Sequence, residues 1–406
     1  MSEHDIDAGA TANPARRVVT IDALRGLVMV IMAIDHVRDF IHRAAMTSQP
    51  TDLASTTPTL FFTRWITHIV APTFAFTAGL GAYLWWQRGK SKRELSTFLL
   101  TRGLWLVLLE LTVMRLAYNF NVSLQYPFLL LVLWVLGLSM IGLALLVWLP
   151  IRVLAVLSVA GIVLHNLLDN VNAAQFGSAA GWWNLVHQVG AFSVAGKLFI
   201  VGYPLIPWIA VMSLGFCFGP LFLKERAERR RYLTIIGAAA TLGFVILRAL
   251  NGYGDPAPWS AQSSPTFTLL SFLNTTKYPP SMAFLFMTLG PALLLLAWFD
   301  RPTLKESNPL VVFGRVPLFY FVAHFYAAHI AAVVLALIRY GSDALRFILH
   351  PVPSMGGPRE LFPPNFGYDL WVAYVVWAVV VVGLYPLCRW FAGVKARRRD
   401  WWVSYT

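Results

Sequence analysis

The amino-acid sequence predicts an all-α integral membrane protein, a single bundle of about ten transmembrane helices with extracytoplasmic loops. Of its 406 residues, 58% are hydrophobic and 13% are charged, whereas a typical soluble domain carries about 25% charged residues. The polar residues gather in short clusters between apolar runs of roughly 20 residues, the length of helix that crosses a hydrocarbon core about 30 Å thick. Basic connectors alternate with connectors poor in basic residues, as expected for a chain that crosses a membrane repeatedly.

The predicted spans follow one another along almost the whole chain. They cover residues 20–43, 59–86, 97–118, 127–149, 152–168, 196–222, 232–250, 279–299, 309–338 and 368–393. The basic connectors, among them 88–93 and 224–231, all fall on one side, which the positive-inside rule makes the cytoplasm. An even number of spans places both termini there too. We therefore expect a cytoplasmic tail over 1–19, a transmembrane domain over 20–394 and a basic cytoplasmic tail over 395–406.

The connectors on the opposite side are longer and carry Trp, Tyr, Asn, Gly and Pro. They comprise residues 44–58, 169–195, 251–278 and 339–367. Two interpretations stay open. The segments fold into a cap outside the membrane, or their aromatic side chains, such as Trp182 and Trp259, anchor the chain at the level of the lipid headgroups.

The composition argues against several classes of function. The net charge of +13 is spread over short loops, with no basic stripe between exposed aromatic residues, so no nucleic-acid partner is expected. The two cysteines, Cys217 and Cys388, lie in apolar runs, where they act as small hydrophobic residues. The sequence shows no Cys/His metal set, no Gly-x-Ser-x-Gly elbow and no phosphate-binding glycine loop. We therefore expect no metal. Residues 1–15 also lack the pattern of a cleaved signal peptide.

The first predicted helix carries ionisable residues that are unusual inside a membrane. Such a residue costs at least about 2.5–3.5 kcal/mol near the centre of a span, so it usually faces the bundle interior and indicates function. His36 follows Arg25 by eleven positions, so the two side chains lie about 20° apart around the helix and roughly 16 Å apart along it. Asp22 shares that face. One polar face therefore almost connects the two sides of the membrane.

Ordinary structural roles for these residues stay open. Arg25 is explained equally by an interfacial side chain paired with Asp22 three positions earlier, and His36 by a hydrogen-bonded core histidine. Asp35 points to another face of the helix. His42 falls at the helix end, where capping and solvation account for it. The shared face of Arg25 and His36 is what favours a functional role.

Several short motifs carry a resemblance to known enzymes. The segment Ile21-Asp22-Ala23-Leu24-Arg25-Gly26, with His36 after ten intervening residues, resembles the opening motif of the transmembrane acyltransferase superfamily, which includes the acyltransferase-3 enzymes. Three further motifs resemble the bacterial branch related to heparan-alpha-glucosaminide N-acetyltransferase. They are Asp35-His36-Val37-Arg38-Asp39-Phe40, Arg64-Trp65-Ile66-Thr67-His68 leading to Ala71-Pro72, and Thr77-Ala78-Gly79.

The resemblance implies a membrane-bound O- or N-acetyltransferase of the bacterial cytoplasmic membrane. It implies an acetyl group carried from cytoplasmic acetyl-CoA to an extracytoplasmic acceptor, a sugar or glycan hydroxyl or amine. The partners are then the lipid bilayer, an acyl-CoA and a glycan-type acceptor, and homo-oligomerisation stays open. His36 becomes the general base or the acyl-accepting nucleophile. His42 is its substitute, because the lysosomal enzyme has asparagine at the position matching His36 and its histidine in the following loop.

A second group of candidates lies on other predicted helices. Arg64 and His68 form an i, i+4 pair near the outer end of the second span, with Pro72 one turn later. We expect the pair to line the reaction chamber. An interfacial arginine beside a packed histidine explains it equally well.

The last candidates lie in the second half of the chain. Arg315, after Gly314, stands near the cytoplasmic start of a span, where a helix N-terminus and a guanidinium can receive a phosphate of CoA. His324 lies deep in the same span as a second polar partner or a satisfied core histidine. Lys277 lies outside, where it contacts an acceptor or lipid headgroups.

One competing function uses the same residues. A proton-coupled transporter or channel also needs a polar stripe through the membrane. Binding of acetyl-CoA distinguishes the enzyme from this alternative.

Overall fold

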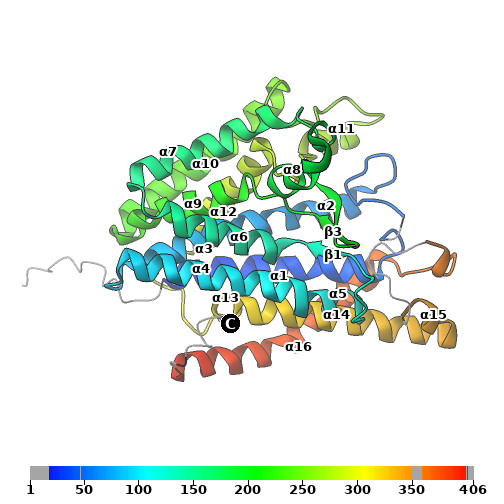
Figure 1. Ribbon diagram of the computed structural model, residues 1–406. Coiled ribbons are helices and arrows are strands. Elements are labelled where there is room, and N and C mark those ends of the chain that lie inside the picture. The colour runs from blue at the N-terminus through cyan, green and yellow to red at the C-terminus, as the bar shows by residue number, and fades with distance from the viewer. Residues whose placement is uncertain (1–17, 46, 349–358, 399, 401–406) are drawn as a thin grey trace, which may run out of the picture.

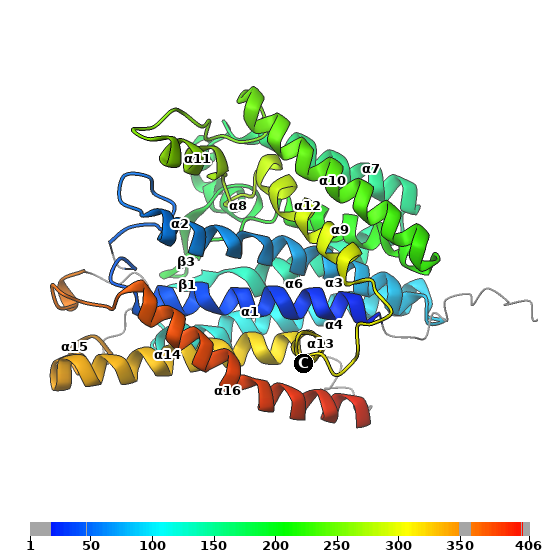
Figure 2. The same cartoon turned by 180° about the vertical axis from the view of Figure 1, so that it is seen from behind.

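The computed structural model describes residues 18–45, 47–348, 359–398 and 400 of the chain. Its helices lie side by side in one bundle, with α1 (Val19–Ile41) near the middle (Figures 1 and 2). One end of the bundle carries the long connectors and is called the loop end. The other end carries the tight connectors and is called the short-connector end. Chain segments run alternately from one end to the other, which gives the predicted up-and-down arrangement.

The first half of the bundle is built from the chain up to Val186. Its helices are α2 (Pro58–Trp65), α3 (Val70–Trp86), α4 (Lys92–Leu109), α5 (Arg115–Asn119), α6 (Val132–Leu146), α7 (Ile151–Leu164) and α8 (Ala180–Val186). A 3₁₀ turn, Ile66–Ile69, joins α2 to α3, and a π-helical turn, Glu110–Met114, joins α4 to α5. A second 3₁₀ turn, His165–Leu168, extends α7.

The second half completes the bundle. Its helices are α9 (Trp208–Cys217), α10 (Arg226–Leu250), α11 (Pro265–Leu273), α12 (Met282–Phe299), α13 (Pro309–Arg315), α14 (Pro317–Tyr340), α15 (Leu345–Ile348) and α16 (Leu370–Arg397). In Figure 1, α14 and α16 lie below α1, whereas α10 and α12 lie above it.

The described residues include seven helical segments that are long and apolar enough to span a membrane. Two shorter apolar helical segments, Val132–Leu146 and Trp208–Leu223, add to them. Helix α1 falls outside this set because it carries Asp22, Arg25, Asp35, Arg38 and Asp39. The chain is therefore mostly helical, with several helices of the length and composition that a membrane protein needs, whereas its insertion in a membrane and the count of ten spans stay predictions.

The structure corrects one predicted span that was drawn as a single helix. The span at 309–338 is two helices, because Pro317 supplies no backbone N–H and begins α14 after a break at Val316. The predicted span at 59–86 is confirmed as one continuous helical segment, Pro58–Trp86, in which a 3₁₀ turn lies between α2 and α3.

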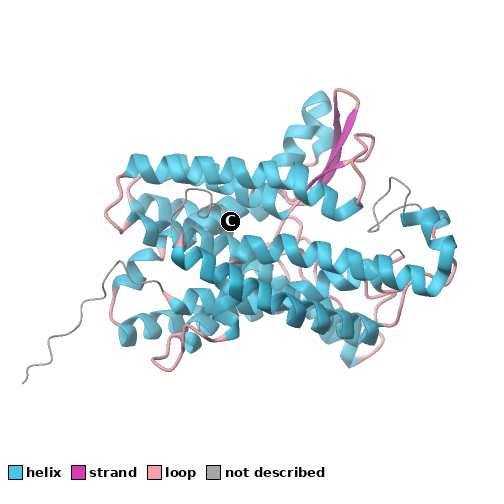
Figure 3. Ribbon diagram, turned by 90° about the horizontal axis from the view of Figure 1, so that it is seen from below, coloured by secondary structure: helices cyan, strands magenta, loops and turns pink. Residues whose placement is uncertain are grey.

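A small sheet at the loop end was not predicted (Figure 3). Strand β3 (Lys197–Val201) pairs in parallel with β1 (Phe128–Leu130) and antiparallel with β2 (Gly190–Val194). A two-residue turn with positive φ, 50° at Ala195 and 72° at Gly196, closes the β2–β3 hairpin. The predicted spans at 127–149 and 196–222 had absorbed β1 and β3, because a short apolar run has no periodicity that separates strand from helix.

Glycines allow the closest helix crossings in the bundle. A Cβ atom on Gly26 would lie 1.8 Å from the carbonyl oxygen of Leu310, and one on Gly314 would lie 1.8 Å from that of Asp22. The backbones of α1 and α13 therefore touch, as small residues permit in membrane bundles. This contact fixes the start of α1, and with it the depth of Arg25.

Candidate functional site

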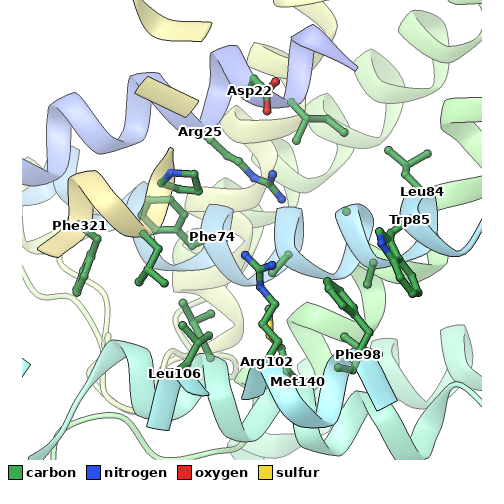
Figure 4. A pocket seen from close by; sticks show the side chains of 18 of the residues that line it. Asp22, Arg25, Phe74, Leu84, Trp85, Phe98, Arg102, Leu106, Met140 and Phe321 are labelled. Carbon is green, nitrogen blue, oxygen red and sulfur yellow. The ribbon is translucent and has the colours of Figure 1, made fainter. Parts of the chain in front are cut away.

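A cavity of about 450 Å³ opens at the short-connector end, between α1, α3, α4, α6 and α14. Arg25 enters it from α1 and Arg102 from α4, and the two guanidinium groups extend toward one another from opposite walls (Figure 4). Arg25 is held in place because its Nε donates to the Thr77 hydroxyl at 3.1 Å and its Nη2 donates to the Thr77 carbonyl. The predicted interior position of Arg25 thus places its charge at the wall of a cavity.

The cavity combines positive charge with an apolar wall. Among the described residues, Arg88 is the third arginine that lines it, and Asp22 is the one lining carboxylate. Trp85 and Phe98 stack with ring centroids 4.5 Å apart and form part of the wall. Such a cavity suits a ligand that carries several negative charges on a partly apolar body.

Two histidines meet deep in the bundle, beyond the inner end of this cavity. The ring of His36 on α1 lies 5.3 Å from that of His324 on α14 and 4.0 Å from that of Phe325. Phe321 lines the cavity, and its ring lies 5.7 Å from His324. His324 therefore lies between the cavity wall and His36. The sequence presented the two histidines separately, and the structure brings them together.

The hydrogen bonds of the pair leave ring nitrogens available. Nδ1 of His324 lies 3.0 Å from the Tyr320 carbonyl, which can only accept, so Nδ1 carries the proton and Nε2 keeps its lone pair. In the described part of the chain, neither Nε2 of His324 nor Nδ1 of His36 has a hydrogen-bond partner, although both atoms are buried. Buried polar atoms without partners are rare and ask for an explanation. A bound substrate supplies one.

A cluster of ion pairs lies beside His36, toward the loop end. Asp35 is buried and accepts from Arg38 at 2.7 Å and from Arg64. Arg38 also pairs with Asp39. Asp35 therefore serves as the shared counter-ion of two arginines from α1 and α2.

A pair of tyrosines and Lys277 extend this cluster into the connector before α12. Arg64 donates to the Tyr278 hydroxyl at 3.3 Å, and that hydroxyl donates to Tyr203 at 3.4 Å. Lys277 lies over the Tyr278 ring, 5.3 Å from its centroid. Its charge also acts on the imidazoles of His36 and His68. Lys277 thus belongs to the site rather than to a distant loop.

The ionisable groups of this connector have shifted pKa values. Burial, reinforced by the positive charge of Arg64, lowers the pKa of Lys277 to about 8. Burial alone would raise the pKa of Tyr278, but the charges of Lys277 and Arg64 outweigh it and lower that pKa. Groups that change charge near neutral pH are typical of functional sites.

Arg64 and His68 contact different partners, and the charge of Arg64 also acts on His68. The 3₁₀ turn begins after Trp65, so the spacing of four residues no longer corresponds to one α-helical turn. Arg64 reaches Asp35 and Tyr278, whereas His68 packs 5.2 Å from the ring of Phe284. Nδ1 of the buried His68 has no partner among the described residues. Both residues stay near the site, on different walls.

His42 and Arg315 lie apart from this site. His42 pairs with Tyr368 through a backbone bridge, and its Nδ1 accepts from the Ala44 N–H at 3.2 Å. Arg315 ends α13 instead of starting a helix, pairs with Glu306, and does not line the cavity. The predicted phosphate position at Arg315 is thus not supported by the placement of that residue.

The sequence interpretation missed several polar residues of the site. Glu110 is buried in the π-helical turn and accepts from the backbone N–H groups of Leu133, at 2.7 Å, and Trp134, at 3.1 Å. It thereby caps the start of α6. Arg102 and Glu110 both lie inside a predicted span, and the rule that singled out Arg25 applies to them as well.

Comparison with known families gives one match. Residues 17–248 match the sequence model described as heparan-alpha-glucosaminide N-acetyltransferase, catalytic. The matched region contains the cavity arginines and His36, and it ends before Lys277 and His324. No curated protein matches the chain.

Proposed function

Because the chain belongs to the heparan-alpha-glucosaminide N-acetyltransferase catalytic family, we propose that it moves an acetyl group from acetyl-CoA to a sugar or glycan hydroxyl or amine. The observation that carries the proposal is the position of the His36–His324 pair. It lies between a cavity lined by three arginines at the short-connector end and the Arg64–Lys277 cluster toward the loop end.

The cavity is the proposed site of the donor. The phosphates of CoA accept hydrogen bonds from Arg25, Arg88 and Arg102, and the stacked Trp85 and Phe98 offer an aromatic surface to the adenine. The thioester then points inward past Phe321 to the histidines. Basic residues are dense in the connectors of this end, so we assign it to the cytoplasm of a bacterial inner membrane, with both termini on that side.

The acceptor enters from the loop end in this proposal. Its hydroxyl or amine reaches His36, which removes the proton as the lone pair attacks the acetyl carbon. The new bond joins acetyl to acceptor, the carbon–sulfur bond breaks, and the thiolate of CoA takes the proton back from the histidines. A variant of this route first places the acetyl group on His36 itself and needs the same residue.

The loop-end residues suit recognition of a polar acceptor. Lys277 and Tyr278 carry groups that donate hydrogen bonds to sugar hydroxyls, and Arg64 holds the Tyr278 hydroxyl in place. The buried carboxylate of Asp35 fixes Arg64 in turn. We assign Asp35 a positioning role in this proposal, because ion pairs already occupy its oxygens.

Transfer of labelled acetyl groups tests the function directly. Protein reconstituted in liposomes receives labelled acetyl-CoA and a panel of amino-sugar and glycan acceptors. His36→Ala should lower the rate by about 10²–10⁴-fold, the range of a lost general base, whereas His42→Ala should leave it close to wild type. Full transfer by His36→Ala would refute the assignment.

The same preparation separates the enzyme from a transporter. Acetyl-CoA should raise the midpoint of thermal unfolding, because a ligand that binds only the folded state stabilises it. An unchanged midpoint at high acetyl-CoA concentration, together with proton-driven solute uptake into the liposomes, would favour the proton-coupled transporter or channel instead.

A further inference from the structure

Three potential metal ligands converge at the loop end, outside the proposed reaction path. They are His165 and Asp169, at the end of the α7 segment, and His187, at the end of α8. Each offers one ligand atom, and these atoms all lie within 4.8 Å of one another. The sequence pattern gave no metal set, because 22 positions separate His165 from His187 and the two lie in unrelated segments.

The two histidines have buried ring nitrogens that lack a hydrogen-bond partner among the described residues. His165 is 3% exposed and His187 is 2% exposed. Among the described residues, neither ring nitrogen of His165 has a hydrogen-bond partner, and Nε2 of His187 has none. Three buried polar atoms in one place are costly unless a ligand satisfies them.

A neighbouring hydrogen bond orients Asp169 as a metal site requires. Asn166 donates to Asp169 at 2.7 Å and leaves the other carboxylate oxygen for a ligand. Hydrogen bonds of this kind, from backbone or amide groups to the ligating side chains, hold metal ligands in position in known sites.

We propose that His165, Asp169 and His187 bind a divalent transition metal, with Zn²⁺ as the representative ion. Two imidazoles and one carboxylate suit Zn²⁺ and its neighbours in the first row, whereas Mg²⁺ and Ca²⁺ take oxygen ligands. Bonds of about 2.0–2.2 Å hold tetrahedral ligands roughly 3.5 Å apart. Each donor atom therefore moves inward by less than about 1 Å on binding. Asp169 is partly exposed, so water completes the coordination.

The metal ties three separate segments together. It joins the end of α7 to the end of α8 directly. It also reaches the start of α12, because the side-chain oxygen of Asn166 accepts from the Met282 N–H at 2.9 Å. In the connector that precedes α12, the Asp255 carboxylate accepts hydrogen bonds from the Thr276 N–H at 2.9 Å and from the Ser281 hydroxyl at 2.7 Å. The ion thus stabilises the connector that carries Lys277.

Titration with Zn²⁺ alone tests the site without any donor or acceptor, so its result is independent of the acetyl-transfer proposal. Full-length protein in detergent is stripped with a chelator and then titrated in competition with a chromogenic indicator. Wild type should bind one Zn²⁺ per chain, and its thermal midpoint should rise on binding. Asp169→Asn and His187→Gln should each weaken binding by at least about 100-fold, and Asn166→Ala by about 10- to 100-fold.

His329→Gln is the matched control. His329 is also a buried histidine, 5% exposed, but one ring nitrogen already bonds to the Ala117 carbonyl at 2.7 Å. This variant should bind Zn²⁺ like wild type. Asp169 is partly exposed and Asn is isosteric, so Asp169→Asn tests the site even where a histidine variant fails to fold. Wild type without a saturable site, or Asp169→Asn with wild-type affinity, would overturn the proposal.

Discussion

The two halves of α1 use their ionisable side chains in opposite ways. Near the start of the helix, Arg25 faces a cavity of about 450 Å³ in which guanidinium groups outnumber the one lining carboxylate. Toward its end, Asp35 lies between Arg38 and Arg64, and ion pairs close every side of it. Both halves carry charge inside the bundle. Only the first places its arginine in the wall of a cavity.

This difference gives the two halves of α1 different expected roles: the first half binds a ligand, and the second half holds side chains in position. Excess charge of one sign beside a cavity is stabilised by a ligand of the opposite sign. A buried cluster of ion pairs is held together by its own members, and it depends on each of them. A substitution in the first half of α1 should therefore change affinity for the donor, whereas one in the second half should change the stability of the fold.

The largest effect on stability is expected from Asp35→Asn. The change removes the shared counter-ion of Arg38 and Arg64, and the Arg38 side chain is 4% exposed. Breaking a buried ion pair at one partner costs about 3–5 kcal/mol, because it leaves a buried charge uncompensated. Thermal unfolding in detergent, followed by scanning fluorimetry, should show a midpoint well below that of wild type.

Asp369→Asn is the matched control for this loss. Asp369 also pairs with an arginine, Arg43, but the two side chains are 56% and 57% exposed. Exposed pairs contribute about 0–1 kcal/mol. Equal losses in the two variants would show that the Asp35 cluster is no more structural than a surface pair.

The next effect is expected from Arg102→Gln, on the donor side of the comparison. The variant keeps a polar side chain in the cavity but removes one of its three positive charges. A hydrogen bond to a charged group contributes about 1.5–3 kcal/mol, so the KM for acetyl-CoA should rise by about 10- to 100-fold. Steady-state kinetics with the acceptor saturating measure this change.

Arg315→Gln tests whether the effect belongs to the cavity. Arg315 lies at the same end of the bundle, but it pairs with Glu306 and does not line the cavity. Its substitution should leave the KM for acetyl-CoA unchanged. A rise as large as that of Arg102→Gln would restore the phosphate position predicted from the sequence.

The hydrophobic runs and the local spacing of residues predicted those features that are determined by residues close together in the sequence. The helical membrane fold follows from the lengths of the apolar runs, and the shared face of Arg25 and Asp22 follows from helical periodicity. Both depend only on residues within one helix. The same reasoning did not predict that Arg64 and His68 contact different partners, because a change from α to 3₁₀ geometry is not encoded in the spacing.

Contacts between distant segments could not be predicted in this way. His36 and His324 are 288 positions apart and meet only through the packing of α1 against α14. His165 and His187 meet because α8 folds back on the end of α7. Nothing in the local sequence of either histidine specifies its partner. Ionisable residues inside apolar spans are nevertheless a signal, and applying it to every span would have singled out Arg102 and Glu110.

The smallest expected effect concerns Lys277 and is a dependence of stability on pH. Burial and the charge of Arg64 lower the pKa of Lys277 to about 8, below its ordinary value near 10.4. Between these values the unfolded chain binds more protons than the folded protein, so the stability of wild type rises with pH across this window.

The variant Lys277→Met lacks the ionisable amine. It should be more stable than wild type at pH 7, and its advantage should shrink as the pH approaches 10. Lys277→Arg keeps its charge throughout, so no part of its stability relative to Lys277→Met comes from titration of residue 277, and any change that remains reports Tyr278, whose pKa the charge at 277 lowers. Midpoints of thermal unfolding at pH 7, 8, 9 and 10 measure all three proteins. If the gap between wild type and Lys277→Met stays the same at every pH, Lys277 is solvated and belongs with the exposed charges rather than with the buried cluster around Asp35.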